Sequence, residues 1–267
     1  MAEVCRHLAY VGPPGTLAAL LLDPPHGLLH QAYAPAEMRG GGTVNADGFG
    51  AGWYPPRAAL PAGAGDVVPP PPARYRSDRP IWTDTGFAAL AAVTVGAAVL
   101  AAVRSATGDM PVTTTGAAPF ADGRWLFSHN GVVRGWPDSV TGIAAALPVR
   151  DLLTLDAPTD AALLWALVRH RLRQGDDPGV ALAETVLTVA AAAPSSRLNL
   201  LLTDGTAVWA TTWTHALSVR AAPGVVTVVS EPTDAGPGWA PVPDRHLVVA
   251  TPDRCDVRPL AAAVRAA

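Results

Sequence analysis

Cys5-Arg6-His7-Leu8-Ala9-Tyr10-Val11 is the stretch from which the fold of this chain can be worked out. Its apolar residues predict a strand over residues 5–11. A cysteine so near an amino terminus can also be a nucleophile, because a free α-amino group on the same residue can act as its base. The ordinary pKa values, about 7.7 to 8.0 for the amine and about 8.5 for the thiol, let the proton pass between them near neutrality. This chemistry requires Cys5 to be residue one of the mature chain.

The rest of the chain is typical of strands interrupted by helices. Residues 160–173 and 180–193 each place apolar side chains on one helical face, and strand patterns cluster towards both ends. This order predicts an α+β fold with two sheets packed face to face and helices outside. The other expected elements are a helix near 16–22, a proline-rich loop at 55–72, a helix and a buried strand within 87–103, a strand at 125–129, a hairpin joining 198–203 to 206–212 through Asp204-Gly205, and strands near 225–230 and 247–250.

Composition narrows the classes of function. The 267 residues are 49% hydrophobic and 15% charged, which predicts a folded globular chain. A net charge of −3 without a basic stripe argues against a nucleic-acid partner. Cys5 and Cys255 show neither metal-ligand nor disulfide spacing, so we expect no structural metal and, by default, a cytoplasmic location. No secretory signal or membrane-spanning run is recognisable, so no membrane partner is expected.

Arg104 stands out because it ends an apolar strand pattern, in Val103-Arg104-Ser105-Ala106-Thr107. A buried guanidinium requires an anionic partner. Bidentate pairing suits a carboxylate, so Arg104 could hold the α-carboxylate of an amino-acid substrate. The alternative is a structural ion pair with an internal Asp or Glu, and the pattern alone favours that alternative.

Three further segments carry polar groups on an Ala-, Gly- and Pro-rich background. Asn130 and Gly131 end a strand pattern, where they form a turn or supply two donors for an oxyanion. Thr159 and Asp160 open the first long helix, and Asp160 is a helix-dipole partner or a carboxylate for a substrate ammonium. The third segment is glycine-rich and has two equally good interpretations, a tight turn that leads into a strand or a wall of the active site. It is the run Asn45-Ala46-Asp47-Gly48-Phe49-Gly50-Ala51-Gly52-Trp53-Tyr54.

Taken in order, these motifs resemble the class II glutamine amidotransferase family. The resemblance rests on Cys-Arg-His-Leu, Asn-Ala-Asp-Gly-Phe-Gly-x-Gly-Trp-Tyr, Val-Arg-Ser-Ala-Thr, Trp-Leu-Phe-Ser-His-Asn-Gly-Val and Thr-Asp-x-x-Leu, and it covers most of the chain. It implies the amino-terminal-nucleophile hydrolase fold, a four-layer αββα sandwich with two mainly antiparallel sheets, as one domain over residues 5–267. Within the family the chain is most similar to the γ-glutamyl hydrolases of ergothioneine biosynthesis, which implies hydrolysis of the γ-glutamyl amide of γ-glutamyl-hercynylcysteine sulfoxide.

The resemblance implies catalytic roles for three residues. Cys5 would be the nucleophile and, through its α-amine, the base, and it would form a γ-glutamyl thioester that water hydrolyses. Asn130 and the Gly131 N–H would form the oxyanion hole. No metal or organic cofactor is implied.

The resemblance also implies how the substrate is bound. Arg104 would hold the α-carboxylate of the γ-glutamyl group and Asp160 its α-ammonium, with Thr107 and His129 also binding substrate. The expected partner is therefore a small-molecule γ-glutamyl amide, and the sequence leaves a homo-oligomer open.

Two departures from the family pattern bear on the substrate. Ala102 stands where many relatives have His, and Gly116-Ala117-Ala118-Pro119-Phe120 stands where many have Asn-x-His-Pro-Phe. The loss of polar groups suits a γ-glutamyl amide larger than glutamine. Its hercynyl half carries a trimethylammonium, and such cations favour aromatic faces. The candidate rings, each equally explained by packing, are Trp53, Trp82, Trp136 and Trp239.

Two other functions stay open, an ammonia-supplying glutaminase subunit and a non-catalytic γ-glutamyl-binding protein. A glutaminase would hydrolyse glutamine efficiently and co-purify with a synthase, whereas a binding protein is the outcome if Cys5 is never exposed. Ordinary removal of Met1 leaves Ala2 and does not expose Cys5. The arginine-rich, lysine-free composition indicates GC-rich coding. We therefore expect Val4 to be a GTG start codon read as methionine, whose removal exposes Cys5, so that residues 1–4 are a non-native or removed leader.

Overall fold

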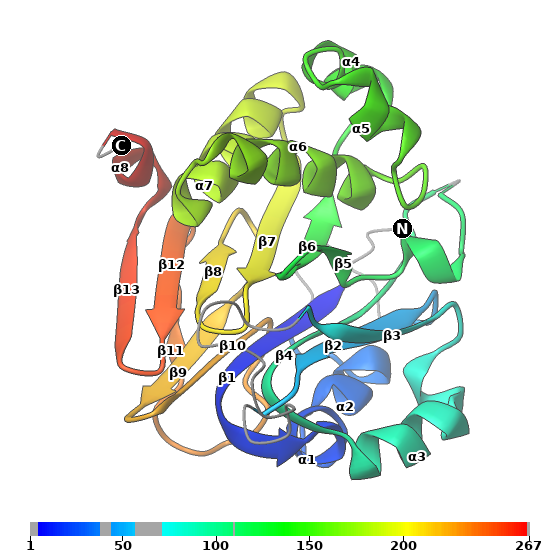
Figure 1. Cartoon of the computed structure of the whole chain (residues 1–267), viewed down its shortest axis with the longest axis vertical. Helices are drawn as coiled ribbons and strands as arrows, with labels where there is room; N and C mark the ends of the chain where they lie inside the picture. Colours follow the sequence, from blue (N-terminus) through cyan, green and yellow to red (C-terminus); the bar gives the residue numbers. More distant parts are fainter. Residues whose placement is uncertain (1–4, 38–43, 57–70, 109, 266–267) are drawn as a thin grey trace, which may run out of the picture.

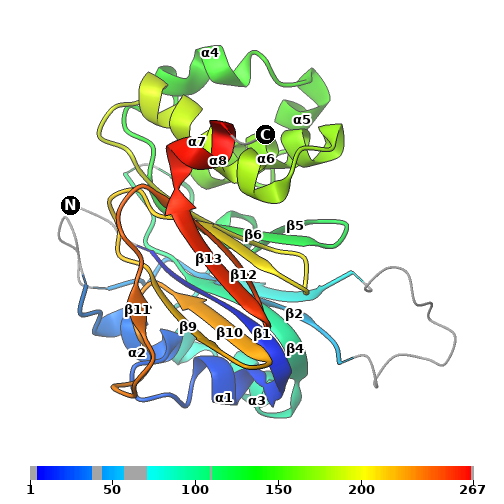
Figure 2. The same cartoon turned by 90° about the vertical axis from the view of Figure 1, so that its left-hand side faces the viewer.

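The computed structural model describes residues 5–37, 44–56, 71–108 and 110–265. Two antiparallel sheets pack face to face, and helices cover the outer face of each (Figure 1, Figure 2). The predicted four-layer α+β sandwich is confirmed. The expected leader, residues 1–4, lies outside the described residues. None of the described helices is both long and apolar enough to cross a membrane.

The first sheet has seven strands, and the strand that follows Cys5 lies in its middle. Successive side chains of a strand point to opposite faces. Leu8 packs towards the outer helices, whereas Ala9 and Val11 pack between the two sheets. Cys5 is an even number of positions from Ala9 and Val11, so its side chain points the same way as theirs, towards the second sheet. In spatial order the strands are β11 (Ala240–Pro241), β9 (Ser218–Ala222), β10 (Val225–Val229), β1 (Arg6–Thr16), β4 (Val95–Val103), β2 (Phe49–Tyr54) and β3 (Ala73–Ser77).

The second sheet has six strands and contains the predicted oxyanion segment. Asn130 pairs with Asn199 in the ladder between β6 and β7. Leu126 of β6 reaches the first sheet, where a Cβ at Gly52 would lie 2.6 Å from its methyl carbon. Glycine at position 52 therefore lets the sheets approach closely. In spatial order the strands are β13 (Arg254–Pro259), β12 (His246–Thr251), β8 (Val208–Thr211), β7 (Arg197–Thr203), β6 (Trp125–Val132) and β5 (Phe120–Asp122).

The described helices that precede β4 lie outside the seven-stranded sheet, and those that follow β6 lie outside the six-stranded sheet (Figure 2). The helix nearest the site begins where Thr159 Oγ1 accepts the Ala162 N–H at 3.2 Å, and it ends at Gly175, whose φ is 94°. The helices are α1 (Leu17–Leu21), α2 (Leu28–Tyr33), α3 (Thr85–Val93), α4 (Thr141–Ala144), α5 (Val149–Leu153), α6 (Asp160–Gln174), α7 (Pro178–Ala192) and α8 (Leu260–Arg265), with short 3-10 turns at Ile81–Thr83, Thr114–Gly116 and Asp138–Val140.

The main departure from expectation is the hairpin between β7 and β8. Asp204 Oδ1 accepts the N–H groups of Thr206 and Ala207 at 2.9 and 3.1 Å, which makes a loop of residues 204–207 in place of a two-residue turn. Strand β8 consequently begins only at Val208. Strands β3, β9 and β13 were not predicted, because their partly exposed, charged residues obscure the apolar alternation. Of the proline-rich loop, residues 57–70 lie outside the described residues.

Candidate active site

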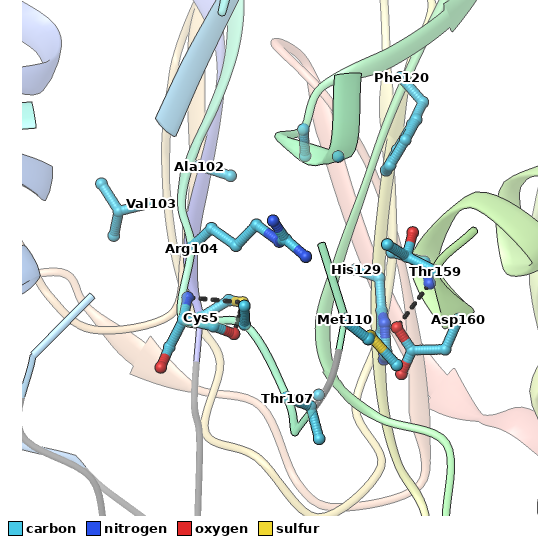
Figure 3. Close-up of a pocket in the computed structure, with 16 residues that line it drawn as sticks. Cys5, Ala102, Val103, Arg104, Thr107, Met110, Phe120, His129, Thr159 and Asp160 are labelled. Carbon is cyan, nitrogen blue, oxygen red and sulfur yellow. Dashed lines mark hydrogen bonds between the residues drawn. The ribbon is translucent and has the colours of Figure 1, made fainter. Parts of the chain in front are cut away.

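A cavity is lined by residues from both sheets. Figure 3 shows Cys5 and Arg104 on one wall, with His129 and Asp160 on the opposite wall. The structure thus brings together residues that are far apart in sequence. Of the predicted site residues, the cavity is lined by Cys5, Arg104, Thr107, His129, Gly131 and Asp160, whereas Asn130 is 1% exposed and does not line it.

The Cys5 thiol lies against the backbone of Ser105, a contact that sequence reasoning missed. The Ser105 N–H donates to the sulfur at 3.5 Å, and the sulfur lies 3.6 Å from the Ser105 carbonyl oxygen. Burial raises the pKa of the Cys5 thiol, and this outweighs the lowering by the Ser105 hydrogen bond and by the charge of Arg104. The thiol is therefore protonated at neutral pH and requires a base to become a nucleophile.

The Arg104 guanidinium points into the cavity from a residue that is only 9% exposed (Figure 3). Its Nη1 donates to the Pro111 carbonyl at 2.9 Å. Gly116 packs directly against it, since a Cβ at position 116 would lie 3.1 Å from Nη1. Within the part of the chain that the structure describes, no carboxylate pairs with Arg104. The alternative of an internal ion pair therefore does not hold there.

Asp160, the first residue of α6, is 5% exposed and carries the opposite charge. Its Oδ2 accepts the Val133 N–H at 2.9 Å and its Oδ1 the Ala161 N–H at 2.7 Å. Among the described residues it forms no ion pair. A buried cation and a buried anion thus face one cavity with no ionic partner in the described part of the chain, and desolvated charges are costly unless a ligand compensates them.

The two predicted oxyanion-hole residues lie on β6. Asn130 Nδ2 donates to Ser230 Oγ at 3.2 Å, and the second N–H of this amide can serve another acceptor. Gly131 lines the cavity. A Cβ at position 131 would overlap the backbone carbonyl of Arg197 and approach His129 Nε2 to 2.7 Å. Position 131 therefore excludes every side chain.

His129 and Thr107 complete the polar lining. His129 Nε2 lies 3.0 Å from the Arg197 carbonyl oxygen, which can only accept, so Nε2 carries the proton. Burial lowers the pKa of His129 although the charge of Asp160 opposes this, so the ring is neutral at neutral pH. Thr107 borders both this cavity and a neighbouring one. Among the described residues, no group of three His, Cys, Asp or Glu side chains could hold a metal ion.

The glycine-rich segment supports the Arg104 loop from behind and does not line the cavity. The Asp47 N–H donates to the Arg104 carbonyl at 3.0 Å, and the Arg104 N–H donates to the Gly48 carbonyl at 2.8 Å. Asp47 Oδ2 accepts the Ala106 N–H at 2.8 Å. The segment is therefore a turn into β2 that also fixes an active-site loop. Sequence reasoning missed the role of Asp47, although its place in a glycine-rich turn was a usable signal.

A buried ion pair next to Cys5 was also missed. Arg6 Nε lies 2.7 Å from Glu231 Oε1, and Arg6 Nη1 donates to the Cys5 carbonyl at 2.9 Å. Glu231 also accepts from His26 Nε2 at 2.7 Å and from two backbone N–H groups at residues 36–37. Burial alone would raise the pKa of Glu231, but the charge of Arg6 and these donors lower it.

The arrangement suits one kind of ligand. An α-amino acid carries a carboxylate and an ammonium on the same carbon, and Arg104 and Asp160 present the complementary charges on facing walls. A ligand bound by both groups leaves its side chain free to meet the Cys5 thiol. A carbonyl group on that side chain is the electrophile that a thiolate attacks.

Comparison with curated proteins finds similarity along nearly the whole chain. It is 42% identical over 245 residues to the γ-glutamyl-hercynylcysteine sulfoxide hydrolase of Mycolicibacterium smegmatis, covering 92% of this chain and 95% of that protein. It is 41% identical over 249 residues to the protein of the same name from Mycobacterium tuberculosis, covering 93% of each. No protein-family model matches the chain.

Solved structures share the fold at lower sequence identity. A glutamine aminotransferase class-II domain protein from Silicibacter pomeroyi superposes with a TM-score of 0.66 and 22% identity, covering 96% of this chain and 99% of that one. Glutamine phosphoribosylpyrophosphate amidotransferase from Bacillus subtilis also gives a TM-score of 0.66, with 12% identity, and the match covers 96% of this chain and 49% of the other. At these identities the likeness concerns the fold alone.

Proposed function

Because the chain belongs to the γ-glutamyl-hercynylcysteine sulfoxide hydrolase family, and is therefore an amidohydrolase, we propose that it cleaves the γ-glutamyl amide of γ-glutamyl-hercynylcysteine sulfoxide. The products are glutamate and hercynylcysteine sulfoxide. One observation supports the proposal most strongly: buried Arg104 and Asp160 face one cavity without ionic partners among the described residues. They complement the α-carboxylate and the α-ammonium of a γ-glutamyl group.

In this proposal Cys5 is residue one, residues 1–4 are absent from the working protein and residues 5–267 form a single domain. The Cys5 α-amine takes the thiol proton, and Sγ attacks the γ-carbonyl carbon. Asn130 Nδ2 and the Gly131 N–H stabilise the oxyanion that forms. The carbon–nitrogen bond then breaks, and the leaving amine takes the proton from the Cys5 ammonium.

The second half of the reaction hydrolyses the γ-glutamyl thioester. The Cys5 α-amine removes a proton from water as the water oxygen attacks the thioester carbon. The carbon–sulfur bond breaks, the thiolate recovers the proton, and glutamate leaves. Arg104 and Asp160, together with Thr107 and His129 beside them, keep the glutamyl end in place through both steps.

The small apolar lining supports a substrate larger than glutamine. Ala102, Gly116 and Ala118 all line the cavity, and they are the positions at which the chain departs from the wider family. Side chains of this size leave space and offer no polar group to a bare amide nitrogen. An ammonia-supplying glutaminase is therefore less well matched to this cavity.

Protein-level sequencing of the native amino terminus, combined with a glutamate-release assay, tests the proposal. We expect Cys5 as the first residue, at least about a hundredfold higher kcat/KM for γ-glutamyl-hercynylcysteine sulfoxide than for glutamine, and no turnover by Cys5→Ala. Full activity of a chain that retains Met1 to Val4 would overturn the amine base. A preference for glutamine would identify a glutaminase, and γ-glutamyl binding without turnover a binding protein.

A further inference from the structure

A second cavity adjoins the first, and both are bordered by Thr107 and Met110. Arg134 and Trp136 form part of its remaining wall. We propose that this second cavity binds the leaving half of the substrate, with Trp136 against the trimethylammonium and Arg134 paired with the carboxylate next to the scissile amide. The inference rests on the proposed function and extends it to residues outside the cleavage machinery.

Trp136 is the best candidate for binding a cation because no other aromatic ring or guanidinium among the described residues contacts its indole. Among the described residues, six of the eight tryptophans have an aromatic ring or a guanidinium against the indole. Trp53 and Trp136 have neither. Both rings pack partly against an apolar cluster, but Trp136 lines the second cavity, whereas Trp53 on β2 lines neither cavity. The tryptophans with a partner are Trp82, Trp125, Trp165, Trp209, Trp213 and Trp239.

The other two candidates from the sequence are unsuited to bind a cation at this site. The Trp239 ring is covered by the Arg220 guanidinium, 4.3 Å from its centroid, and its Nε1 donates to Asp234 at 3.2 Å. Trp82 packs edge-on against Tyr33, with centroids 6.0 Å apart. Neither ring lines either cavity.

Arg134 supplies a positive charge that has no ionic partner among the described residues. Its backbone is fixed, since its N–H donates to Ser196 Oγ at 3.0 Å and its carbonyl accepts from Ser139 Oγ at 2.7 Å. The side chain itself is exposed. The amine released from a γ-glutamyl-cysteinyl compound is an α-amino acid, so a carboxylate lies one carbon from the scissile nitrogen. A guanidinium is well suited to bind that carboxylate.

Arg134 and Trp136 lie in one turn that follows Gly131 along the chain. The Trp136 N–H donates to the Val133 carbonyl at 3.4 Å, and both Arg134 and Trp136 line the second cavity. Gly131 lines the first cavity. The leaving group carries its cysteinyl carboxylate next to the scissile nitrogen and its trimethylammonium at the far end. The second cavity therefore offers a guanidinium for the one group and an indole for the other.

Three substrates separate these contacts. γ-Glutamyl-hercynylcysteine sulfoxide carries both groups, γ-glutamylcysteine carries the carboxylate alone, and γ-glutamyl ethylamide carries neither. For Trp136→Ala we expect kcat/KM to fall about fivefold to thirtyfold on the first substrate and less than about twofold on the other two. For Arg134→Gln we expect a fall of about tenfold on the first two substrates and none on the ethylamide.

Trp82→Ala and Arg150→Gln serve as matched controls, because Trp82 and the exposed Arg150 line neither cavity. Both should retain wild-type rates on all three substrates. Equal losses on all three by Trp136→Ala or Arg134→Gln would show a structural role and overturn the assignment, as would wild-type rates on all three. If the wild-type protein releases glutamate from none of the three, the proposed function itself fails.

Discussion

The Arg6 guanidinium and the Glu231 carboxylate form an ion pair of 2.7 Å, with both side chains 2% exposed, next to Cys5. Because Arg6 also binds the Cys5 carbonyl, the pair fixes the backbone from which the thiol projects. Glu231 in turn holds the backbone at residues 36–37. One carboxylate thus joins β1 to a loop about thirty positions further along the chain.

Glu231→Gln should lower the free energy of unfolding by about 3 kcal/mol at neutral pH, because it removes the charged half of a buried ion pair with Arg6. The pKa of Glu231 is lowered in the folded state. Its stabilisation is therefore complete above the unfolded pKa of about 4.3 and is lost as the pH falls through the folded pKa. Urea unfolding at several pH values should show the difference between wild type and variant shrinking below about pH 4.

Glu184→Gln is the control for this effect. Glu184 pairs with Arg171 at 3.5 Å, but its side chain is 30% exposed. Its loss should cost no more than about 0.5 kcal/mol. Similar costs for the two variants would contradict the importance assigned to the buried pair.

The pH dependence of kcat/KM should follow the Cys5 amine. Because burial raises the pKa of the Cys5 thiol, spontaneous ionisation does not supply thiolate near neutrality. A neutral amine must accept the proton, so kcat/KM should rise with pH and level off above about pH 8. A chain with one extra alanine before Cys5 should be at least about a hundredfold slower. Equal rates and equal pH profiles for the two chains would contradict the amine base.

Asp160→Asn should remove the preference for a substrate that carries an α-ammonium over the same substrate without it. We expect the wild-type kcat/KM to fall about tenfold to a hundredfold when that ammonium is replaced by hydrogen, and the variant to treat both substrates alike. Asp177→Asn is the control, because Asp177 caps α7 through the N–H groups of Gly179 and Val180. It should keep wild-type discrimination. If Asp160→Asn also kept it, the ammonium would be bound elsewhere.

Gly131→Ala should destabilise the protein by more than about 3 kcal/mol or prevent folding, because the new Cβ would overlap the Arg197 carbonyl. Gly142→Ala in α4 is the matched change, since a Cβ there has nothing within 4 Å. It should be neutral or stabilise by up to about 1 kcal/mol. Thermal unfolding of both variants measures the contrast, and equal melting temperatures would disprove it.

Local patterns in the sequence identify much of this fold. Alternating side chains after Cys5 indicate β1, and the apolar face beginning at Asp160 indicates α6, because both periods arise within one element. The Arg6–Glu231 pair joins positions 225 residues apart, and no local period records it. Similarly, only the three-dimensional structure shows that Arg104 is buried without a carboxylate among the described residues. The sequence motifs identify the candidate side chains, whereas the packing of the two sheets determines which of these side chains lie close together.

The charges of the candidate site belong to different layers. Arg104 follows β4 of the first sheet, and Asp160 is bound to the backbone just after β6 of the second. The separation between the two charges is therefore set by the thickness of apolar packing between the sheets, to which the close approach of Gly52 and Leu126 contributes. If Arg104 and Asp160 bind a γ-glutamyl group as proposed, the apolar interior of the sandwich sets the length of amino-acid end that fits between them. Volume changes in that interior should alter affinity even where no mutated atom touches the ligand.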